Sequence, residues 1–255
     1  RWIDIGIRFQ PSELGKILLI LFFSSYLMRN EEEINNPKFI VQTAILAAVP
    51  LALIVKEPDL STTIVTFLII ASMMFITGLS YKLVGIVLGI TIPSIAILLL
   101  VIVNQGSSIL EGYQSLRILA WLKPEDYPAT AYQQQNSIMA VGSGQFLGKG
   151  LYNTSVDSVK NGNYISEPHT DFIFAVAGEE LGFIGSVLIV LLLLFIGYQC
   201  IQTAKVAKDL SGKLICSGMA ALVGFQSFVN ICVVTGLFPN TGLPLPFVSY
   251  GLTSL

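Results

Sequence analysis

Long apolar runs separated by short polar segments dominate the chain. A membrane-spanning helix needs roughly 20 apolar residues, and a chain in lipid must satisfy its own backbone hydrogen bonds, so each such run predicts a helix. Six runs are long enough, or nearly so, at about 12–28, 39–55, 61–79, 83–103, 171–201 and 214–236. The pattern predicts an all-α fold, a polytopic transmembrane helical bundle.

Two of these runs carry further expectations. The run at 171–201 is longer than one span, so we expect its first two turns to lie at the membrane rim or outside it. A seventh run begins near Pro246 and is cut at Leu255. Because the chain opens on a charged segment without an initiator methionine or signal peptide, we expect further helices before and after the given sequence.

Composition supports a membrane protein and excludes other classes. Of the 255 residues, 53% are hydrophobic and 12% charged, and the mean hydropathy is +0.74. The charged fraction is about half that of an ordinary soluble domain. The net charge of −2 leaves no basic surplus for nucleic-acid phosphates. Three cysteines without C-x-x-C spacing, Cys200, Cys216 and Cys232, indicate small core residues rather than disulfides or a metal site.

Lysine and arginine in the short connections predict the orientation, because they are enriched on the cytoplasmic side. One side has only Lys56, and the other has Arg29, Lys38, Lys82, Lys205, Lys208 and Lys213. The second side is therefore predicted to be cytoplasmic. This divides the chain into membrane helices at 1–103, a large extracytoplasmic loop at 104–170, and membrane helices at 171–255. Amphipathic pieces at 112–122 and 132–146 indicate an ordered loop, and loops of this length are usually functional.

Polar side chains within the apolar runs are candidates for function, since ionisable groups are costly in a bilayer. Glu13 and Lys16 share one face of the first run and can form an ion pair, which leaves open a structural role and a substrate-facing role. Gln226 and Asn230 share a face of the last complete run, which favours hydrogen bonds between helices.

Two polar connections have plain structural interpretations. In Lys56–Asp59, the proline ends one helix and Asp59 can cap the next, while Glu57 has no such explanation and stays a candidate. The glycine-rich stretch 142–150 lacks the spacing and the final hydroxyl of a phosphate-binding loop. Turn geometry explains it, although backbone N–H groups in such a turn can also bind phosphate.

Asp171 lies where the long loop meets the fifth complete run, next to the only histidine, His169. The pattern leaves two interpretations open. Thr170 or Asp171 can cap the following helix. Alternatively, a carboxylate at the outer membrane surface can act as a general base on a hydroxyl of a membrane-tethered substrate.

A set of motifs in fixed order resembles one family across essentially the whole chain. The motifs are RWIDIG at 1–6, FQPSELGK at 9–16, EPDLST at 57–62, AVGSG at 140–144, GKGL at 148–151, HTDFIFA at 169–175, EELG at 179–182 and PLPFVSYG at 244–251. Together they are similar to the SEDS family of RodA, FtsW and SpoVE. Two positions depart from the family pattern: Gln145 and Leu252 each replace a usual glycine.

The resemblance implies a bacterial cytoplasmic membrane protein of about ten helices, of which this chain holds the fourth to the start of the tenth. It implies a peptidoglycan glycosyltransferase that polymerises lipid II, with inversion and loss of a polyprenyl diphosphate, in elongation, division or sporulation. The implied partner is a class B penicillin-binding protein. The alternatives are a lipid II translocator and a noncatalytic scaffold of the wall-synthesis complex.

The resemblance also implies roles for single residues. Asp171 is the expected catalytic base. Lys16, Lys149 and Arg117 are the candidates for stabilising the diphosphate. Magnesium or manganese is an expected cofactor, with Asp171 and Glu167 as candidate ligands, although no ligand cluster in the sequence shows a site. We expect Glu13 and Glu57 to line the substrate cavity, and His169 and Thr170 to shape the surroundings of Asp171.

Overall fold

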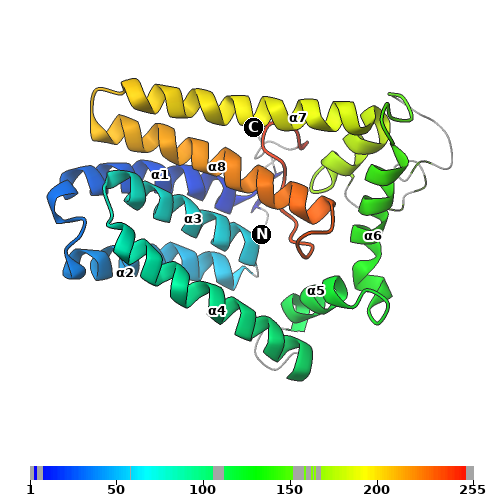
Figure 1. Cartoon of the computed structure of the whole chain (residues 1–255), viewed down its shortest axis with the longest axis horizontal. Helices are drawn as coiled ribbons and strands as arrows, with labels where there is room; N and C mark the ends of the chain where they lie inside the picture. The colour runs from blue at the N-terminus through cyan, green and yellow to red at the C-terminus, as the bar shows by residue number, and fades with distance from the viewer. Residues whose placement is uncertain are drawn as a thin grey trace.

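The computed structural model describes residues 3–4, 8–57, 59–105, 112–151, 158, 162, 164 and 168–250. These residues form a bundle of long helices that is capped at one end by shorter ones (Figure 1). The helices are α1 (Pro11–Arg29), α2 (Pro37–Lys56), α3 (Leu60–Thr77), α4 (Tyr81–Gln105), α5 (Gly112–Leu122), α6 (Pro128–Ser143), α7 (Ile173–Val206) and α8 (Leu210–Val234).

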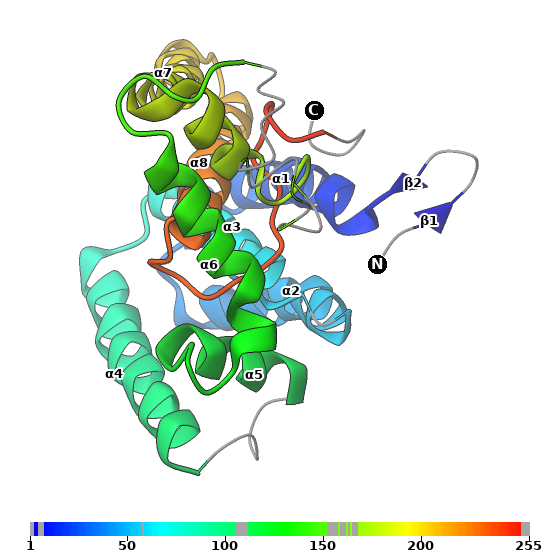
Figure 2. The same cartoon turned by 90° about the vertical axis from the view of Figure 1, so that its right-hand side faces the viewer.

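The described residues also include three short elements that the apolar pattern did not predict. Strands β1 (Ile3–Asp4) and β2 (Arg8–Phe9) pair antiparallel before α1, and the 3-10 turn η1 (Glu31–Glu33) follows α1. The hairpin projects from the end of the bundle where α1 begins (Figure 2). Two-residue strands leave too few alternating positions for a sequence signal. The fold is nearly all-helical, as predicted.

Local sequence explains where several helices begin. Proline occupies the first position of α1 and of α2, where its missing N–H group costs nothing. The Asn36 side chain caps α2 by accepting from Lys38 N at 3.1 Å. Asp59 caps α3 in the same way, with Thr62 N donating to Oδ1 at 3.1 Å, which confirms the predicted cap.

Five of the described helices are long and apolar enough to cross a membrane: α1, α2, α3, α7 and α8. The run predicted at 83–103 is helical as α4, and its crossing of the membrane stays a prediction. The predicted seventh run starts in turns through Tyr250, and residues 251–255, with Leu252, lie outside the described residues. The chain is thus a multi-pass membrane protein.

Helix α8 is the centre of the bundle, since it packs against α1, α3 and α7. On one side it contributes Leu214 to a core with Phe23 of α1 and Met73 of α3. On the other side Val233 packs with Phe174 of α7. Apolar side chains buried in this way hold together helices whose outer faces suit lipid.

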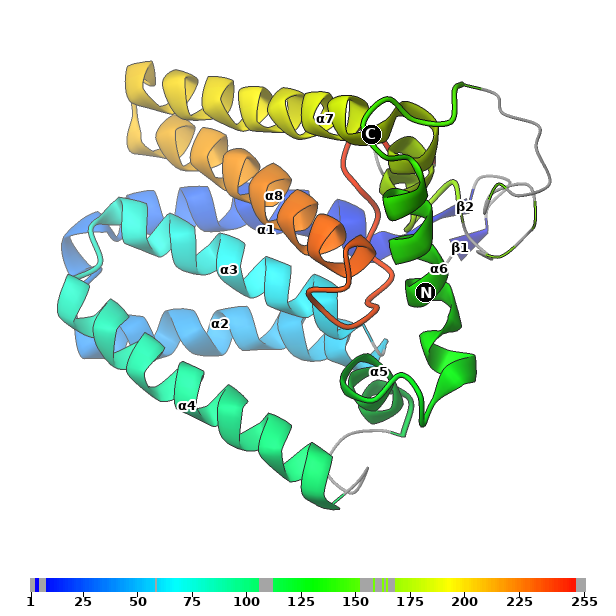
Figure 3. The same cartoon turned by 45° about the vertical axis from the view of Figure 1, so that its right-hand side comes forward.

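The connections between helices lie at two opposite ends of the bundle, grouped as the charge pattern predicted. The α1–α2, α3–α4 and α7–α8 connections lie at one end, and α5 and α6 lie at the other (Figure 3). The piece predicted at 112–122 is α5, and the piece predicted at 132–146 is helical over Pro128–Ser143 as α6. The lysine-rich connections therefore share one end, opposite the helices of the long loop.

Candidate functional site

Asp171 lies in the turns at 168–172 that lead into α7, and it is half-buried. Phe172 occupies the N-cap position of α7, and its own side chain makes no cap hydrogen bond. The N-cap position therefore falls one residue after Asp171, and capping of this helix by the Thr170 or Asp171 side chain stays a prediction.

The backbone beside Asp171 is tied to the segment after α8. Tyr250 N donates to the His169 carbonyl at 2.8 Å. Ser249 Oγ donates to the Thr170 carbonyl at 2.7 Å and accepts from Leu245 N at 2.7 Å. The Ser-Tyr pair of the last motif thus fixes the turn that carries Asp171. The exposed His169 contributes its backbone to this arrangement.

Asn230 of α8 reaches both segments from inside the bundle. Its Nδ2 donates to the Asp171 carbonyl at 2.8 Å and to the Leu243 carbonyl at 2.6 Å. The side chain is 1% exposed. The predicted role of Asn230 in bonds between helices is thus replaced by bonds to two irregular segments, whose meeting the sequence does not reveal.

Gly242 lies directly against the Asp171 carboxylate. A Cβ added to Gly242 would stand 3.2 Å from Asp171 Oδ2, and the residue has φ +73°. A side chain at this position would be strained by the backbone and would press on the carboxylate. Glycine therefore allows the 235–250 segment to approach Asp171 closely.

Helices α5 and α6 of the long loop hold the segment after α8. Trp121 and Arg117 of α5 donate to the carbonyls of Gly236 and Asn240, at 2.8 and 3.1 Å. From α6, Gln134 Nε2 donates to the Phe238 carbonyl at 2.6 Å. These bonds satisfy carbonyls of the non-helical segment that follows α8. The long loop is therefore ordered against the neighbourhood of Asp171, and Arg117 is one of its contacts there.

Glu13 and Lys16 form the predicted ion pair, and a third group completes it. Lys16 Nζ lies 2.8 Å from Glu13 Oε1, with side chains 0% and 8% exposed. It also donates to Gln226 Oε1 at 2.6 Å, while Gln226 Nε2 contacts Glu13 Oε2 at 3.4 Å and the Pro244 carbonyl at 3.1 Å. The pair therefore joins α1 to α8, which confirms the predicted bonding of Gln226 between helices.

The EPDLST segment lies at the same end of the bundle. Asp59 Oδ2 accepts from Gln10 Nε2 at 3.1 Å, so its second oxygen ties the start of α3 to the residue before α1. Glu57 ends α2 as its C-cap residue and is half-buried. Asp59 thus has a structural task in addition to its cap, and the substrate role of Glu57 stays a prediction.

The glycine-rich stretch forms a turn against a break in α7. Gly182 has φ 67° and ψ −160° inside α7, which separates the first turns of the long run from its straight part. Gly148 N would lie 2.3 Å from a Cβ on Gly182, so the two chains touch through glycine backbone. The glycine-rich stretch therefore serves as a turn that packs against α7, as predicted.

Lys149 extends from this turn to the buried Glu179 of α7. The Lys149 Nζ to Glu179 Oε1 distance is 2.7 Å, and Ser158 donates to the other carboxylate oxygen at 3.3 Å. Lys149 N also donates to the Glu179 carbonyl at 2.8 Å. The sequence analysis proposed Lys149 for the diphosphate and missed its partner Glu179, because nothing in the local FAVAGEE stretch at 174–180 indicates that Glu179 is buried.

The family model for FtsW, RodA and SpoVE, described as "Cell cycle protein", matches residues 1–255. The chain belongs to the FtsW/RodA/SpoVE family. Two relatives called probable peptidoglycan glycosyltransferase FtsW are similar to it: that of Escherichia coli O157:H7, 36% identical over 100% of this chain and 60% of its own length, and that of Buchnera aphidicola, 37% identical over 100% and 70%.

Solved structures share the fold of this FtsW/RodA/SpoVE family chain. A chain from a study titled "Structural coordination of polymerization and crosslinking by a peptidoglycan synthase complex" has a TM-score of 0.74 and 28% identity, over 99% of this chain and 68% of that one. The rod shape determining protein RodA of Thermus thermophilus has a TM-score of 0.62 and 26% identity, over 100% and 63%. The chain spans about 60% of the length of the Escherichia coli relative.

No metal site is evident in the part of this family chain that the structure describes. Among those residues, no group of three His, Cys, Asp or Glu side chains could hold an ion. Glu167, the expected ligand beside Asp171, lies outside the described residues. The magnesium or manganese ion therefore stays an expectation.

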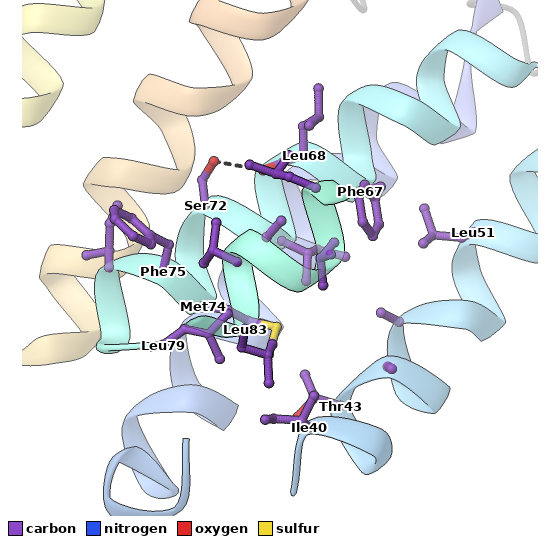
Figure 4. A pocket seen from close by; sticks show the side chains of 18 of the residues that line it. Ile40, Thr43, Leu51, Phe67, Leu68, Ser72, Met74, Phe75, Leu79 and Leu83 are labelled. Carbon is purple, nitrogen blue, oxygen red and sulfur yellow. Dashed lines mark hydrogen bonds between the residues drawn. The ribbon is translucent and has the colours of Figure 1, made fainter. Parts of the chain in front are cut away.

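A cavity of about 810 Å³ lies between α2, α3 and α4. Leu51, Phe67 and Leu83 are among its apolar lining residues (Figure 4). Ser72, which also lines it, donates to the Leu68 carbonyl of its own helix at 2.8 Å. The lining has no ionisable side chain, so the cavity suits a hydrocarbon and not the reacting groups of a sugar.

Proposed function

We propose that this chain is the part of a peptidoglycan glycosyltransferase that contains the catalytic base, and that the full protein polymerises lipid II into glycan strands. Two relatives carry the name probable peptidoglycan glycosyltransferase FtsW. The observation that carries the proposal is the placement of Asp171. Its half-buried side chain lies in the turns that lead into α7, and its carboxylate lies close to Gly242.

In the proposed reaction, Asp171 takes the proton from the 4-hydroxyl of the acceptor sugar as that oxygen attacks the anomeric carbon of the donor. The bond to the polyprenyl diphosphate breaks, and the configuration inverts from α to β. A general base must lie within hydrogen-bond reach of the proton it removes. A diphosphate leaves without being protonated, so one carboxylate suffices where a glycosidase needs two.

The charge that develops on the diphosphate needs a cation, and Lys16, Lys149 and Arg117 are the three candidates. Lys16 is buried in its ion pair with Glu13, and Lys149 is paired with Glu179. Arg117 is half-buried and contacts the carbonyl of Asn240, two residues before Gly242. Its guanidinium carries five N–H donors in a fork that matches phosphate oxygens.

We further propose the bacterial cytoplasmic membrane as the location, with α5, α6 and Asp171 facing outside. The grouping of the lysine-rich connections at the opposite end supports this orientation (Figure 3). As partner we propose a class B penicillin-binding protein that crosslinks the glycan. The likeness to a chain studied in a peptidoglycan synthase complex, with a TM-score of 0.74, supports such an assembly.

The test is polymerisation of lipid II by the full-length protein, purified with its penicillin-binding partner. Wild type should convert lipid II to glycan strands, and Asp171→Ala should fail while it still folds and binds the partner. An active Asp171→Ala complex would remove Asp171 from the chemistry. Loss of partner binding in the same variant would instead indicate a structural role.

The translocator alternative is less well supported by the contacts. Transport needs polar groups along a path that opens alternately to each side. The polar groups that suggested it bond to each other or to backbone: Lys16 to Glu13 and Gln226, and Asn230 to two carbonyls. Movement of labelled lipid II across liposome membranes without polymerisation would support the translocator.

If the protein is instead a noncatalytic scaffold, Asp171 substitutions should leave the rate of lipid II polymerisation unchanged.

A further inference from the structure

We propose that Asn230 is a positioning residue for Asp171, which it holds in place from the interior of the bundle. This inference rests on the proposed role of Asp171 as the base. Asn230 belongs to α8, the helix that packs against α1, α3 and α7. It therefore transmits the position of the rigid bundle to two segments that have no regular structure.

The side chain of Asn230 has the donors that this task requires. A primary amide has two N–H donors on one nitrogen. Both go to main-chain carbonyls, at 2.8 Å to Asp171 and 2.6 Å to Leu243. The group is 1% exposed, so water has little access to replace it. Leucine has a similar size and no donors.

Companion bonds extend this tether along the chain on both sides. The carbonyls of three consecutive residues are each held by a donor from α8 or the segment after it: His169 by Tyr250 N, Thr170 by Ser249 Oγ and Asp171 by Asn230 Nδ2. One turn earlier in α8, Gln226 holds the carbonyl of Pro244.

The two segments that Asn230 joins are the two that meet at the carboxylate. Leu243 follows Gly242, whose Cα faces Asp171 Oδ2 closely enough that a Cβ would stand 3.2 Å from it. A single amide therefore fixes both sides of this contact. Loss of the amide should let the carboxylate move relative to the substrate, and displacements of about 1 Å can cost roughly 100-fold in rate.

The experiment uses the full-length protein with its penicillin-binding partner and lipid II as substrate. We expect Asn230→Leu to lower kcat by about 10- to 100-fold and to leave KM within about twofold, because a base acts on the transition state. Ser217→Ala is the matched control: Ser217 is also a polar residue of α8, and its hydroxyl bonds only to carbonyls of its own helix, Lys213 and Leu214. Its kcat should match wild type.

Ser249 supplies a second variant that does not depend on Asn230. Ser249→Ala removes the donor to the Thr170 carbonyl and should lower kcat without raising KM. Ser249→Thr keeps a hydroxyl and should restore most of the rate. A normal kcat in both Asn230→Leu and Ser249→Ala would overturn the positioning role, as would a raised KM with unchanged kcat, which indicates substrate binding.

Hydrogen exchange separates this inference from the proposed function. The Tyr250 amide is bonded to the His169 carbonyl, so its exchange reports whether the turn is held, with no reference to activity. In Asn230→Leu this amide should exchange roughly tenfold faster, the effect of losing about one hydrogen bond. Unchanged exchange overturns the tether. An active Asp171→Ala complex, by contrast, overturns the base assignment and leaves the exchange result standing.

Discussion

Removal of the Lys16 ammonium tests whether the Glu13–Lys16 pair holds the bundle together. The variant Lys16→Met keeps the length and apolar character of the side chain and removes its charge. Glu13 would then keep a buried carboxylate, 8% exposed, whose remaining partner among the described contacts is Gln226 at 3.4 Å. Removing one member of a buried pair costs more than the pair itself contributes.

The magnitude follows from the geometry. Two unit charges 2.8 Å apart attract by roughly 6 kcal/mol at an effective dielectric constant of about 20. Burial of the two ions costs a similar amount, so the intact pair contributes little net stability. Lys16→Met alone should destabilise the fold by about 3–5 kcal/mol. The double variant Glu13→Leu with Lys16→Met should lose far less, because no unpaired charge is left.

The assay is thermal unfolding of the detergent-solubilised protein, with all four members of the double-mutant cycle compared. We expect Lys16→Met to unfold on the order of 10 °C below wild type, and the double variant to recover most of that difference. A Lys16→Met protein as stable as wild type would refute the structural role of the pair. A stable double variant without polymerase activity would indicate that the pair also serves the substrate.

Three further substitutions have effects that the backbone geometry predicts. Gly182→Ala should destabilise the fold by more than about 3 kcal/mol in thermal unfolding, because its Cβ would meet Gly148 N at 2.3 Å; Gly197→Ala, in open space on the same helix, should be neutral or slightly stabilising. Gln145→Gly should increase the free energy of unfolding by about 1 kcal/mol and so raise the melting temperature, since Gln145 has a left-handed backbone with φ 49°. Gly242→Ala should lower the polymerisation rate while the melting temperature stays near that of wild type. A loss of rate that is matched by a loss of folded protein would argue against a close contact with the proposed base.

Much of the bundle could be predicted because its signals are local. The run predicted at 12–28 is α1 at Pro11–Arg29, and the amphipathic piece at 112–122 is α5. Periodicity and apolar length decide such elements. The cap by Asp59 was also predictable, because an N-cap bonds to an N–H group only a few residues away.

The rest depends on residues that are distant in sequence. Nothing near Lys149 indicates that Glu179 would take its charge. The break at Gly182 is a consequence of the glycine turn packed on it. The same holds for the start of α7, since tertiary bonds to the segment after α8 hold the turns at 168–172 that precede the helix.

Long-range contacts also involve Gln145, which departs from the family pattern, and His169, which was expected to shape the surroundings of Asp171. Gln145 stands at a left-handed position, where a glycine is the less strained residue, and its carbonyl accepts from Phe183 N at 2.9 Å. His169, the only histidine of the chain, contributes its carbonyl to Tyr250. The sequence alone has no means of assigning that contact.

The initial rate of lipid II consumption by Asp171→Asn tests whether Asp171 is the base for glycan polymerisation. The substitution keeps the shape of the side chain and removes its basicity. General bases contribute roughly 100- to 10,000-fold, so the full-length complex should lose at least about 100-fold in rate while its melting temperature and partner binding stay near those of wild type. An Asp171→Asn complex that polymerises lipid II at the wild-type rate would contradict the account.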